Sequence, residues 1–215
     1  MSYKKKFIDF MMSAGVLTFG DFTTKSGRKT PYFINTGNYK TGSQISILGD
    51  YYARCINDSG ESFDALFGPA YKGIPLCAAA ASSLFRNHGR DVQYCFNRKE
   101  KKDHGEGGGI VGYQPKSGDT LAIVEDVVTA GTAVRESLEL LRSIGDIKVG
   151  ALFVSVDRME KGTGELSALD ELRQSMGINV YPIITVRDII AAMPEGDERV
   201  GKMEAYLAQY GALTK

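Results

Sequence analysis

From residue 63 onward, short apolar runs alternate with longer stretches in which apolar residues recur at helical spacing. The short runs are typical of buried strands, and the longer stretches are typical of helices with one buried face. This pattern predicts strands at 63–67, 92–96, 121–124, 149–156 and about 179–186, and helices at 74–88, 132–144 and about 166–176. Strands that alternate with helices form βαβ units around a parallel sheet, with helices on both faces. We therefore expect an α/β fold that binds its ligands beyond the carboxyl ends of the strands.

The first sixty positions follow a different pattern. Helical spacing of apolar residues predicts one helix ending at Gly15 and a second over 45–56, closed by Gly60. Between them the chain is rich in turn-forming residues, with Phe-Gly-Asp-Phe at 19–22 and Ser-Gly-Arg-Lys at 26–29. Such a segment predicts short strands around a loop. The total length of 215 residues suits one α/β domain or two small ones.

Composition and net charge argue against several classes of function. With 26 basic against 26 acidic residues, the chain has no net charge that would attract nucleic acid or an anionic membrane. No apolar run approaches the ~20 residues of a membrane helix, and no signal-peptide pattern follows the lysines near the start. Cys55, Cys77 and Cys95 are odd in number and widely spaced, which suits reduced, packed thiols in the cytoplasm. We expect a cytoplasmic protein without nucleic-acid or membrane partners.

The segment after strand 121–124 carries the most chemistry. Glu125 and Asp126 end the apolar run, and the small residues from Thr129 to Thr132 open the next helix. Backbone N–H groups of such a loop, together with the positive end of the helix dipole, can close around a phosphate. The two carboxylates would repel a phosphate, so we expect them to face a polyol or a cation. A sugar phosphate would satisfy both halves, and an acidic turn with a threonine N-cap is the alternative.

Two more loops carry cations. Gly-Pro-Ala-Tyr-Lys-Gly at 68–73 combines two glycines, which permit close backbone approach, with Lys72. It suits either a second anion site or an ordinary turn. The charged stretch from Arg98 to His104 is followed by glycines that we expect to form neither helix nor strand. It is either a solvated loop or a lid that brings cations to an anionic leaving group.

The glycines at 107–112 match the G-x-G-x-x-G pattern of dinucleotide-binding sites. They follow a charged loop rather than a strand, and Pro115 and Gly118 disfavour an immediate helix. A dinucleotide fingerprint requires a strand before it and a helix after it, so we reject that hypothesis.

Two places suit a planar, charged ligand. The segment 24–35 sets cations beside aromatic residues, which could stack on a ring while binding an anion, or could pack as a simple hairpin. Arg158 ends the strand 149–156 at the expected ligand edge. It could bind a carboxylate through two N–H groups, or it could pair with Asp157 or Glu160.

Together these segments resemble the type I phosphoribosyltransferases, and most closely the orotate phosphoribosyltransferases. The acid pair with Thr-Ala-Gly-Thr resembles the family's signature for phosphoribosyl pyrophosphate (PRPP). Four further segments point to the orotate enzymes: Phe-Thr-Thr-Lys-Ser-Gly-Arg at 22–28, Gly-Pro-Ala-Tyr-Lys-Gly-Ile-Pro at 68–75, Asn-Arg-Lys-Glu at 97–100 and Lys-Asp-His-Gly-Glu-Gly at 102–107. The resemblance implies a parallel, Rossmann-like sheet flanked by helices. It also implies a single domain over 1–215, to which residues 1–40 contribute a small N-terminal hood.

The resemblance further implies a pentosyltransferase, which is a kind of glycosyltransferase. It would transfer ribose 5-phosphate from PRPP to orotate, giving orotidine 5'-monophosphate and pyrophosphate in de novo pyrimidine biosynthesis. Breaking the bond to pyrophosphate builds positive charge on the sugar and negative charge on the leaving group. Preorganised cations should therefore meet the pyrophosphate, and water should be excluded. Magnesium, the implied cofactor, would be bound mainly through PRPP with no direct protein ligand.

Roles of individual residues also follow from the resemblance. Expected in catalysis are Lys102, Lys99, His104 and Asp126. Expected to bind PRPP are Lys25, Tyr71, Lys72, Arg98, Lys99, Lys102, His104, Glu125, Asp126, Val127, Val128, Thr129, Ala130, Gly131, Thr132 and Ala133. Expected to contact orotate are Phe33, Ile34, Thr129 and Arg158.

In the resembled family the lid reaches into the neighbouring subunit. Arg98, Lys99, Lys102 and His104 would therefore complete the partner's site, and activity would require a homodimer with shared active sites. The sequence departs from the family pattern at Glu125, where many relatives have Asp, and at Ile34, where a second aromatic residue is common.

Two other functions stay open. One is a phosphoribosyltransferase acting on a purine or another pyrimidine, although Lys25, Phe33 and Arg158 favour an acidic pyrimidine. The other is a PRPP-sensing regulator that binds DNA, against which the neutral charge and the absence of a basic stripe argue.

Overall fold

The computed structural model describes residues 2–24, 27–99, 109–128, 131–162 and 164–212. Its strands are β1 (Leu17–Thr23), β2 (Lys29–Ile34), β3 (Ala65–Gly68), β4 (Gln93–Asn97), β5 (Ile110–Gly112), β6 (Thr120–Glu125), β7 (Lys148–Asp157) and β8 (Asn179–Thr185). Its helices are α1 (Tyr3–Ser13), α2 (Gly42–Ser59), α3 (Gly73–His88), α4 (Thr132–Ile144), α5 (Ala168–Met176), α6 (Val186–Ala191) and α7 (Glu198–Tyr210), and a 3-10 turn spans Thr36–Asn38.

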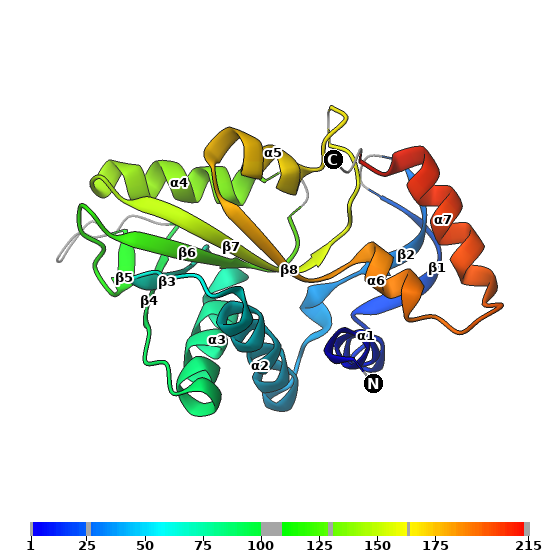
Figure 1. Cartoon of the computed structure of the whole chain (residues 1–215), viewed down its shortest axis with the longest axis horizontal. Coiled ribbons are helices and arrows are strands. Elements are labelled where there is room, and N and C mark those ends of the chain that lie inside the picture. The colour runs from blue at the N-terminus through cyan, green and yellow to red at the C-terminus, as the bar shows by residue number, and fades with distance from the viewer. Residues whose placement is uncertain (1, 25–26, 100–108, 129–130, 163, 213–215) are drawn as a thin grey trace.

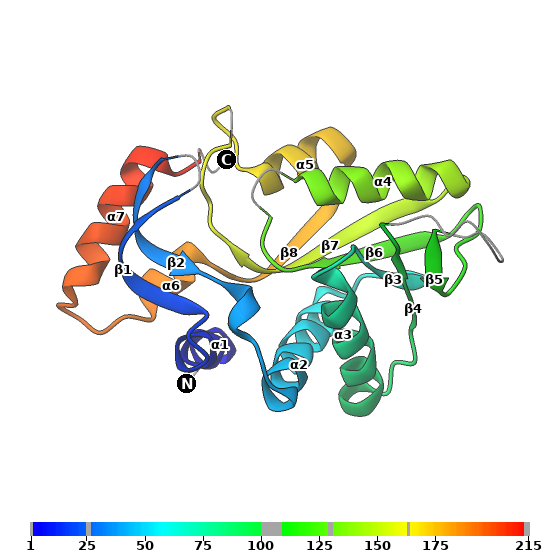
Figure 2. The same ribbon diagram turned by 180° about the vertical axis from the view of Figure 1, so that it is seen from behind.

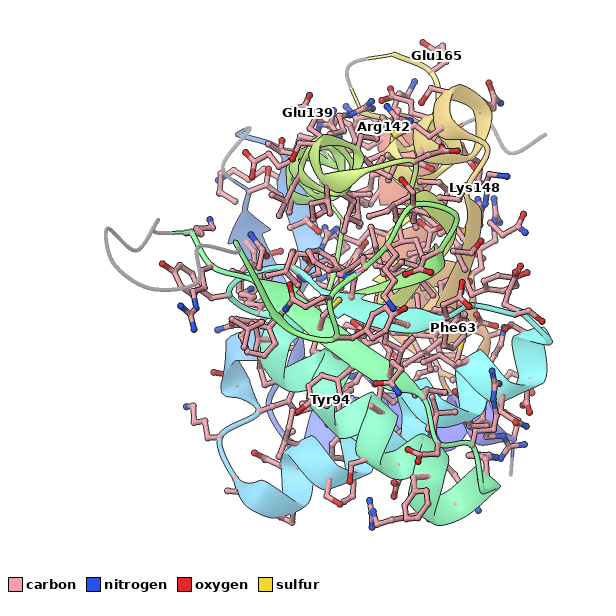
Figure 3. All side chains as sticks on the ribbon, turned by 90° about the vertical axis from the view of Figure 1, so that its left-hand side faces the viewer. Phe63, Tyr94, Glu139, Arg142, Lys148 and Glu165 are labelled. Atoms are coloured by element: carbon pink, nitrogen blue, oxygen red, sulfur yellow. The ribbon has the colours of Figure 1, made fainter. Side chains whose placement is uncertain are left out.

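The main sheet has six strands in the order β5-β4-β3-β6-β7-β8. Its strands pair in parallel except for β4 with β5. Helices α2 and α3 cover one face, and α4 and α5 cover the other (Figure 1). Seen from the β5 end, the same layers stand above and below the sheet (Figure 3). The α/β fold with a central parallel sheet flanked by helices, as predicted from the alternating pattern, is confirmed.

Local signals explain the helix boundaries. Thr41 and Gln44 form a capping box at the start of α2, and Gly60 ends that helix with φ +70°. Gly89 and Gly177 end α3 and α5 in the same left-handed conformation, with φ of +64° and +65°. A side chain disfavours this conformation, so these glycines stop each helix where the sequence indicated.

A smaller unit lies beside the main sheet. Strands β1 and β2 pair antiparallel, α7 packs on β2, and α1 packs on β1 and α6. Figures 1 and 2 show these five elements together from both sides. The sequence analysis made no prediction for α6 and α7, which bring the C-terminal part of the chain to the N-terminal segment. Residues 19–22 lie within β1 at a register shift, and the turn of the hairpin lies around Thr24 and Arg28.

The expectation for the glycine-rich stretch was wrong in one part. Ile110–Gly112 forms strand β5, which pairs antiparallel with β4. Ile110 is buried, and a Cβ on Gly112 would lie 2.6 Å from the carbonyl oxygen of Tyr94. The glycine therefore permits the close pairing that we expected it to prevent. The next element is strand β6 rather than the helix that a dinucleotide fingerprint requires, in agreement with the rejection of that hypothesis.

The three cysteines are free thiols, with Cys77 and Cys95 fully buried in the core and Cys55 packed against it. Within the described parts of the chain, no helix has the length and apolar character required to cross a bilayer.

Candidate active site

The acid pair lies at the carboxyl edge of the sheet, where β6 ends. Glu125 and Asp126 are each only 8% exposed. The buried Tyr52 of α2 donates its hydroxyl to the carbonyl oxygen of Glu125 at 2.6 Å. Ser155 of β7 donates both its N–H and its hydroxyl to the carbonyl oxygen of Asp126, each at 2.8 Å. The backbone of the acid pair is therefore fixed from a neighbouring helix and a neighbouring strand.

The carboxylate of Asp126 joins three segments of the chain. Its Oδ2 accepts a hydrogen bond from the Thr36 hydroxyl at 2.6 Å and one from Lys72 Nζ at 2.8 Å. Thr36 follows β2, and Lys72 precedes α3. Lys72 was predicted from the sequence, whereas Thr36, Tyr52 and Ser155 belong to no motif and were not.

The two acids differ in their protonation. Burial raises the pKa of Glu125 from 4.5 to about 7, although a hydrogen bond from the Asp126 N–H opposes the shift. Burial would also raise the pKa of Asp126, but hydrogen bonds from Lys72 and Thr36 outweigh it and lower that pKa. Near neutral pH, Asp126 therefore carries the negative charge, and Glu125 is close to its midpoint.

The loop after the acid pair leads into α4. Gly131 takes a left-handed conformation, with φ +71°, at the N-cap of that helix, where it has no side chain to cap the first N–H groups. Unsatisfied N–H groups and the helix dipole favour an anion at such a position. Thr132 and Ala133 face a cavity of about 330 Å³ that Tyr71, Lys72 and the acid pair also line. Thr129 and Ala130 lie outside the described residues.

The loop between β3 and α3 forms the opposite wall of this cavity. A Cβ on Gly68 would lie 2.5 Å from the carbonyl oxygen of Gly73, so a glycine at this position lets the two ends of the loop approach each other closely. Asn97, at the end of β4, accepts a hydrogen bond from the Ala70 N–H at 2.8 Å. The peptide bond between Ala70 and Tyr71 is cis. The loop is thus fixed by backbone fit and by Asn97, which the sequence analysis had not assigned to the site.

The base of the expected lid lies beside this loop. Lys99 Nζ lies 5.4 Å from the centre of the Tyr71 ring, and the Arg98 N–H donates to the Gly109 carbonyl oxygen at 2.8 Å. Arg98 and Lys99 are exposed. Lys102 and His104, like Lys25 of the hairpin turn, lie outside the described residues.

A second cavity, of about 620 Å³, continues from the first. It is lined by Phe33, Ile34 and Arg158, and it shares Lys72 and Asp126 with the first cavity. The Phe33 ring is 43% exposed and stacks on Phe22 with ring centres 5.5 Å apart. An aromatic ring, an arginine and Asp126 thus line one cavity.

Arg158 does not stand free in this cavity. Its Nε and one terminal nitrogen donate to Glu160 Oε1 at 2.9 and 2.6 Å, and its guanidinium carbon lies 4.5 Å from the centre of the Tyr32 ring. Of the two ion-pair partners that the sequence left open, Asp157 and Glu160, the structure contains Glu160.

The similarity to known proteins agrees with this geometry. The profile of the phosphoribosyl transferase domain matches residues 35–167. An orotate phosphoribosyltransferase of Clostridium beijerinckii is 49% identical over 221 residues, which cover 98% of this chain and 99% of that protein. Another, of Cronobacter sakazakii, is 50% identical over 212 residues, covering 97% and 98% of the two chains. The chain belongs to the orotate phosphoribosyltransferase family.

The crystal structure of a family member confirms the expected fold. The orotate phosphoribosyltransferase of Francisella tularensis is 38% identical, with a TM-score of 0.88 over 96% of this chain and 100% of that chain. The predicted type I phosphoribosyltransferase fold is therefore confirmed. The residues that resemble the family signature, Glu125 to Ala133, line the first cavity wherever they are described.

The side chains that line the site indicate how magnesium could be bound there. In the described part of the chain, no group of three or more His, Cys, Asp or Glu side chains could hold a metal ion. The carboxylates on the described wall of the first cavity are those of the acid pair, and Asp126 Oδ2 is already engaged by Thr36 and Lys72. Magnesium commonly keeps several waters and binds substrate phosphates through few carboxylates, so this site fits an ion delivered on a phosphorylated substrate.

Proposed function

We propose that the protein is an orotate phosphoribosyltransferase, a pentosyltransferase that moves ribose 5-phosphate from PRPP to orotate. The products would be orotidine 5'-monophosphate, used in pyrimidine biosynthesis, and pyrophosphate. The observation that carries this proposal is the pair of cavities that meet at Lys72 and Asp126. One cavity has the features of a sugar-phosphate site, and the other has those of a site for a planar anion.

The loop Val127–Ala133 would hold the 5-phosphate of PRPP. Support comes from the open start of α4 at Gly131 and from Thr132 and Ala133 on the cavity wall. Asp126, fixed through its backbone and its side chain, would accept hydrogen bonds from the ribose hydroxyls. Glu125 lies beside it and would assist there or contact the water shell of the metal.

Cations would meet the pyrophosphate leaving group. Lys72 is supported in this role by its place on the cavity wall, with Tyr71 beside it. Lys99, Arg98, Lys102, His104 and Lys25 are assigned to the same side by resemblance alone. Positive charge fixed there in advance would stabilise the negative charge that builds as the bond to the sugar breaks.

Magnesium bound to PRPP would neutralise charge on the pyrophosphate oxygens and orient the sugar. The part of this chain would be to receive that complex: Asp126 keeps its negative charge because Lys72 and Thr36 lower its pKa.

Orotate would occupy the second cavity. Phe33 would lie against its ring, Ile34 would flank it, and Arg158 would donate to its polar groups, as would Thr129 by resemblance. An exposed aromatic ring and a half-buried arginine that line the same cavity suit a flat anion better than a neutral purine.

We also propose a homodimer in which the lid of each subunit completes the site of its partner. This proposal rests on the resemblance to the family, in which the lid reaches into the neighbouring subunit. Free thiols at all three cysteines suit a reducing compartment, so we propose that the enzyme acts in the cytoplasm.

The deciding experiment incubates the protein with PRPP, magnesium and orotate and follows the ultraviolet absorbance of orotate. Adenine, hypoxanthine and uracil are tested in parallel, and reactions without PRPP or with a chelator serve as controls. Loss of orotate that requires both PRPP and magnesium is the expected result. Turnover of another base instead would overturn the assignment of the second cavity, and tight PRPP binding without turnover of any base would favour a regulator.

A further inference from the structure

Glu160 is the residue that determines where Arg158 lies. Three donors converge on its Oε1: Nε of Arg158 at 2.9 Å, a terminal nitrogen of Arg158 at 2.6 Å, and the Tyr32 hydroxyl at 3.1 Å. The side chains of Arg158 and Glu160 are only 15% and 16% exposed. The contact is therefore a shielded, charge-assisted one, which is stronger and more directional than an ion pair on the surface.

Glu160 uses one edge of the guanidinium group. Nε and one terminal nitrogen are engaged, so the other terminal nitrogen, Nη1, is the one that Glu160 does not use. Behind the pair, the guanidinium lies over the buried Tyr32 ring, and the Tyr206 ring meets Tyr32 edge-on at 6.1 Å. The arginine is thus held on one edge by a carboxylate and on one face by an aromatic ring.

The turn that carries both residues is also held in place. Met159, between them, takes a left-handed conformation with φ +52°. Its N–H donates to Asp157 Oδ1 at 2.8 Å, and its carbonyl oxygen accepts from the Ala212 N–H at 2.8 Å. The Lys161 N–H donates to the Tyr210 carbonyl oxygen at 3.0 Å. The end of α7 and the residues after it therefore hold this turn against the second cavity.

We propose that Glu160 is a positioning residue that sets the selectivity of the second cavity for an acidic pyrimidine. It presents Arg158 to the ring substrate in one orientation and offsets its charge. An anion is then recognised by the placement of donors more than by charge attraction. This inference rests on the proposed function, because it assigns Arg158 to the orotate side of the site.

Two substitutions of Glu160 distinguish its effect on the position of Arg158 from its effect on the charge of the site. Glu160→Asp keeps the charge but withdraws the oxygens by one methylene, about 1.5 Å, which takes them out of hydrogen-bonding reach of the guanidinium. Glu160→Gln keeps the length and an acceptor oxygen but removes the charge. If placement matters most, Glu160→Asp raises the KM for orotate about tenfold, equivalent to ~1.4 kcal/mol, and Glu160→Gln raises it about threefold. The KM for PRPP stays within about twofold in both variants, because the PRPP half of the site is untouched.

Glu165 provides the matched control. It lies near the same turn, where Figure 3 labels it at the top of the view, and its side chain is 67% exposed in a loose pair with Lys161. Glu165→Asp and Glu165→Gln should leave both KM values unchanged. Thermal unfolding of all four variants shows whether each is folded.

The outcomes are distinct. Wild-type turnover of orotate is measured first, and its absence overturns the proposed function and this inference with it. If the wild type is active, an unchanged KM for orotate in the Glu160 variants overturns this inference alone. An equal rise in both KM values, or a fall in kcat alone, also overturns it, because either result indicates general damage. If Glu160→Asp does not fold, Glu160→Gln decides through the same comparison of KM values.

Discussion

Nζ of Lys72 lies 2.8 Å from Oδ2 of Asp126, and this contact joins the two cavities of the site. The lysine side chain is 65% exposed, whereas the aspartate side chain is 12% exposed. The same carboxylate oxygen accepts the Thr36 hydroxyl at 2.6 Å. The carboxylate is therefore fixed without the lysine, and the lysine can move from it to a ligand at small cost.

Lys72→Met tests whether Lys72 binds the substrate while Thr36 is sufficient to hold the Asp126 carboxylate. The lysine end of this pair is 65% exposed and Thr36 still donates to the carboxylate, so the loss of stability should be small, about 1 kcal/mol, and the melting temperature should fall only slightly. Removing a cation that faces the pyrophosphate should raise the KM for PRPP about tenfold or more, because a charge-assisted contact is lost. Steady-state kinetics and thermal unfolding measure the two effects.

Lys148→Met is the control for that substitution. Lys148, labelled in Figure 3, is an exposed lysine at the start of β7, whereas the acid pair lies at the carboxyl end of β6. Its substitution should change neither the melting temperature nor the KM for PRPP. A KM for PRPP that stays normal in Lys72→Met would remove Lys72 from the substrate site.

The raised pKa of Glu125 predicts a specific pH dependence of stability. The pKa is about 7 in the folded protein and 4.5 in the ordinary carboxyl group, so between these values the folded chain holds a proton that the unfolded chain has released. The stability due to this proton is complete below pH 4.5 and is lost as the pH rises to about 7. In urea denaturation, Glu125→Gln should gain about 1–3 kcal/mol relative to wild type between pH 5 and pH 8.

Glu139→Gln, which removes an exposed acid on α4, is the control for the pH experiment (Figure 3). Its difference in stability from wild type should be the same at both pH values. A constant difference for Glu125→Gln as well would show that burial does not raise the pKa of this acid.

The helices and strands could be predicted from the sequence where local signals determine the structure. The helix predicted at 132–144 is α4, and the predicted strand 121–124 lies within β6, because apolar spacing reports directly on which face is buried. The position of the acid pair at the sheet edge also followed from the sequence, since the carboxyl ends of parallel strands share one edge.

Contacts between distant segments could not be predicted in this way. Thr36 meets Asp126 across 90 positions of sequence, and neither residue carries a local mark of that contact. The pairing of Arg158 with Glu160 depends on the turn at Met159, a left-handed non-glycine residue that propensity would not suggest. Strand β5 was missed because pairing with β4, rather than its own composition, stabilises it.

Gly68→Ala should damage both stability and the site. The added Cβ would lie 2.5 Å from the Gly73 carbonyl oxygen and 2.7 Å from the Cβ of Cys77, so the loop or α3 must shift. Overpacking of this kind costs about 1–3 kcal/mol, and the shift should also raise the KM for PRPP by displacing Lys72. Urea denaturation and kinetics measure the two effects.

Gly201→Ala makes the matched comparison for Gly68→Ala. A Cβ at this position of α7 meets nothing within 4 Å, so the substitution should stabilise the protein by about 0.5–1 kcal/mol through helix propensity. Equal stability of the two alanine variants would contradict the steric argument.

Lys102→Ala tests the expected lid, whose residues 100–108 lie outside the described parts of the chain. A cation that meets the leaving group mainly in the transition state should affect turnover more than binding. We expect kcat to fall about 10²–10³-fold while the KM for PRPP changes only a few-fold. Normal turnover in the variant would refute the role assigned to Lys102.

Subunit mixing tests the shared active site independently. Lys102→Ala and Asp126→Ala subunits are each expected to be inactive alone, because each lacks a different part of every site. If the lid of one subunit serves the acid pair of the other, a mixed dimer contains one site with both residues intact and one site that lacks both. Random mixing in equal amounts makes about half of the dimers mixed, so activity should recover to about one quarter of the wild-type value.

Size-exclusion chromatography with two distinguishable tags measures how many mixed dimers form. Mixed dimers without recovered activity would show that each subunit uses its own lid.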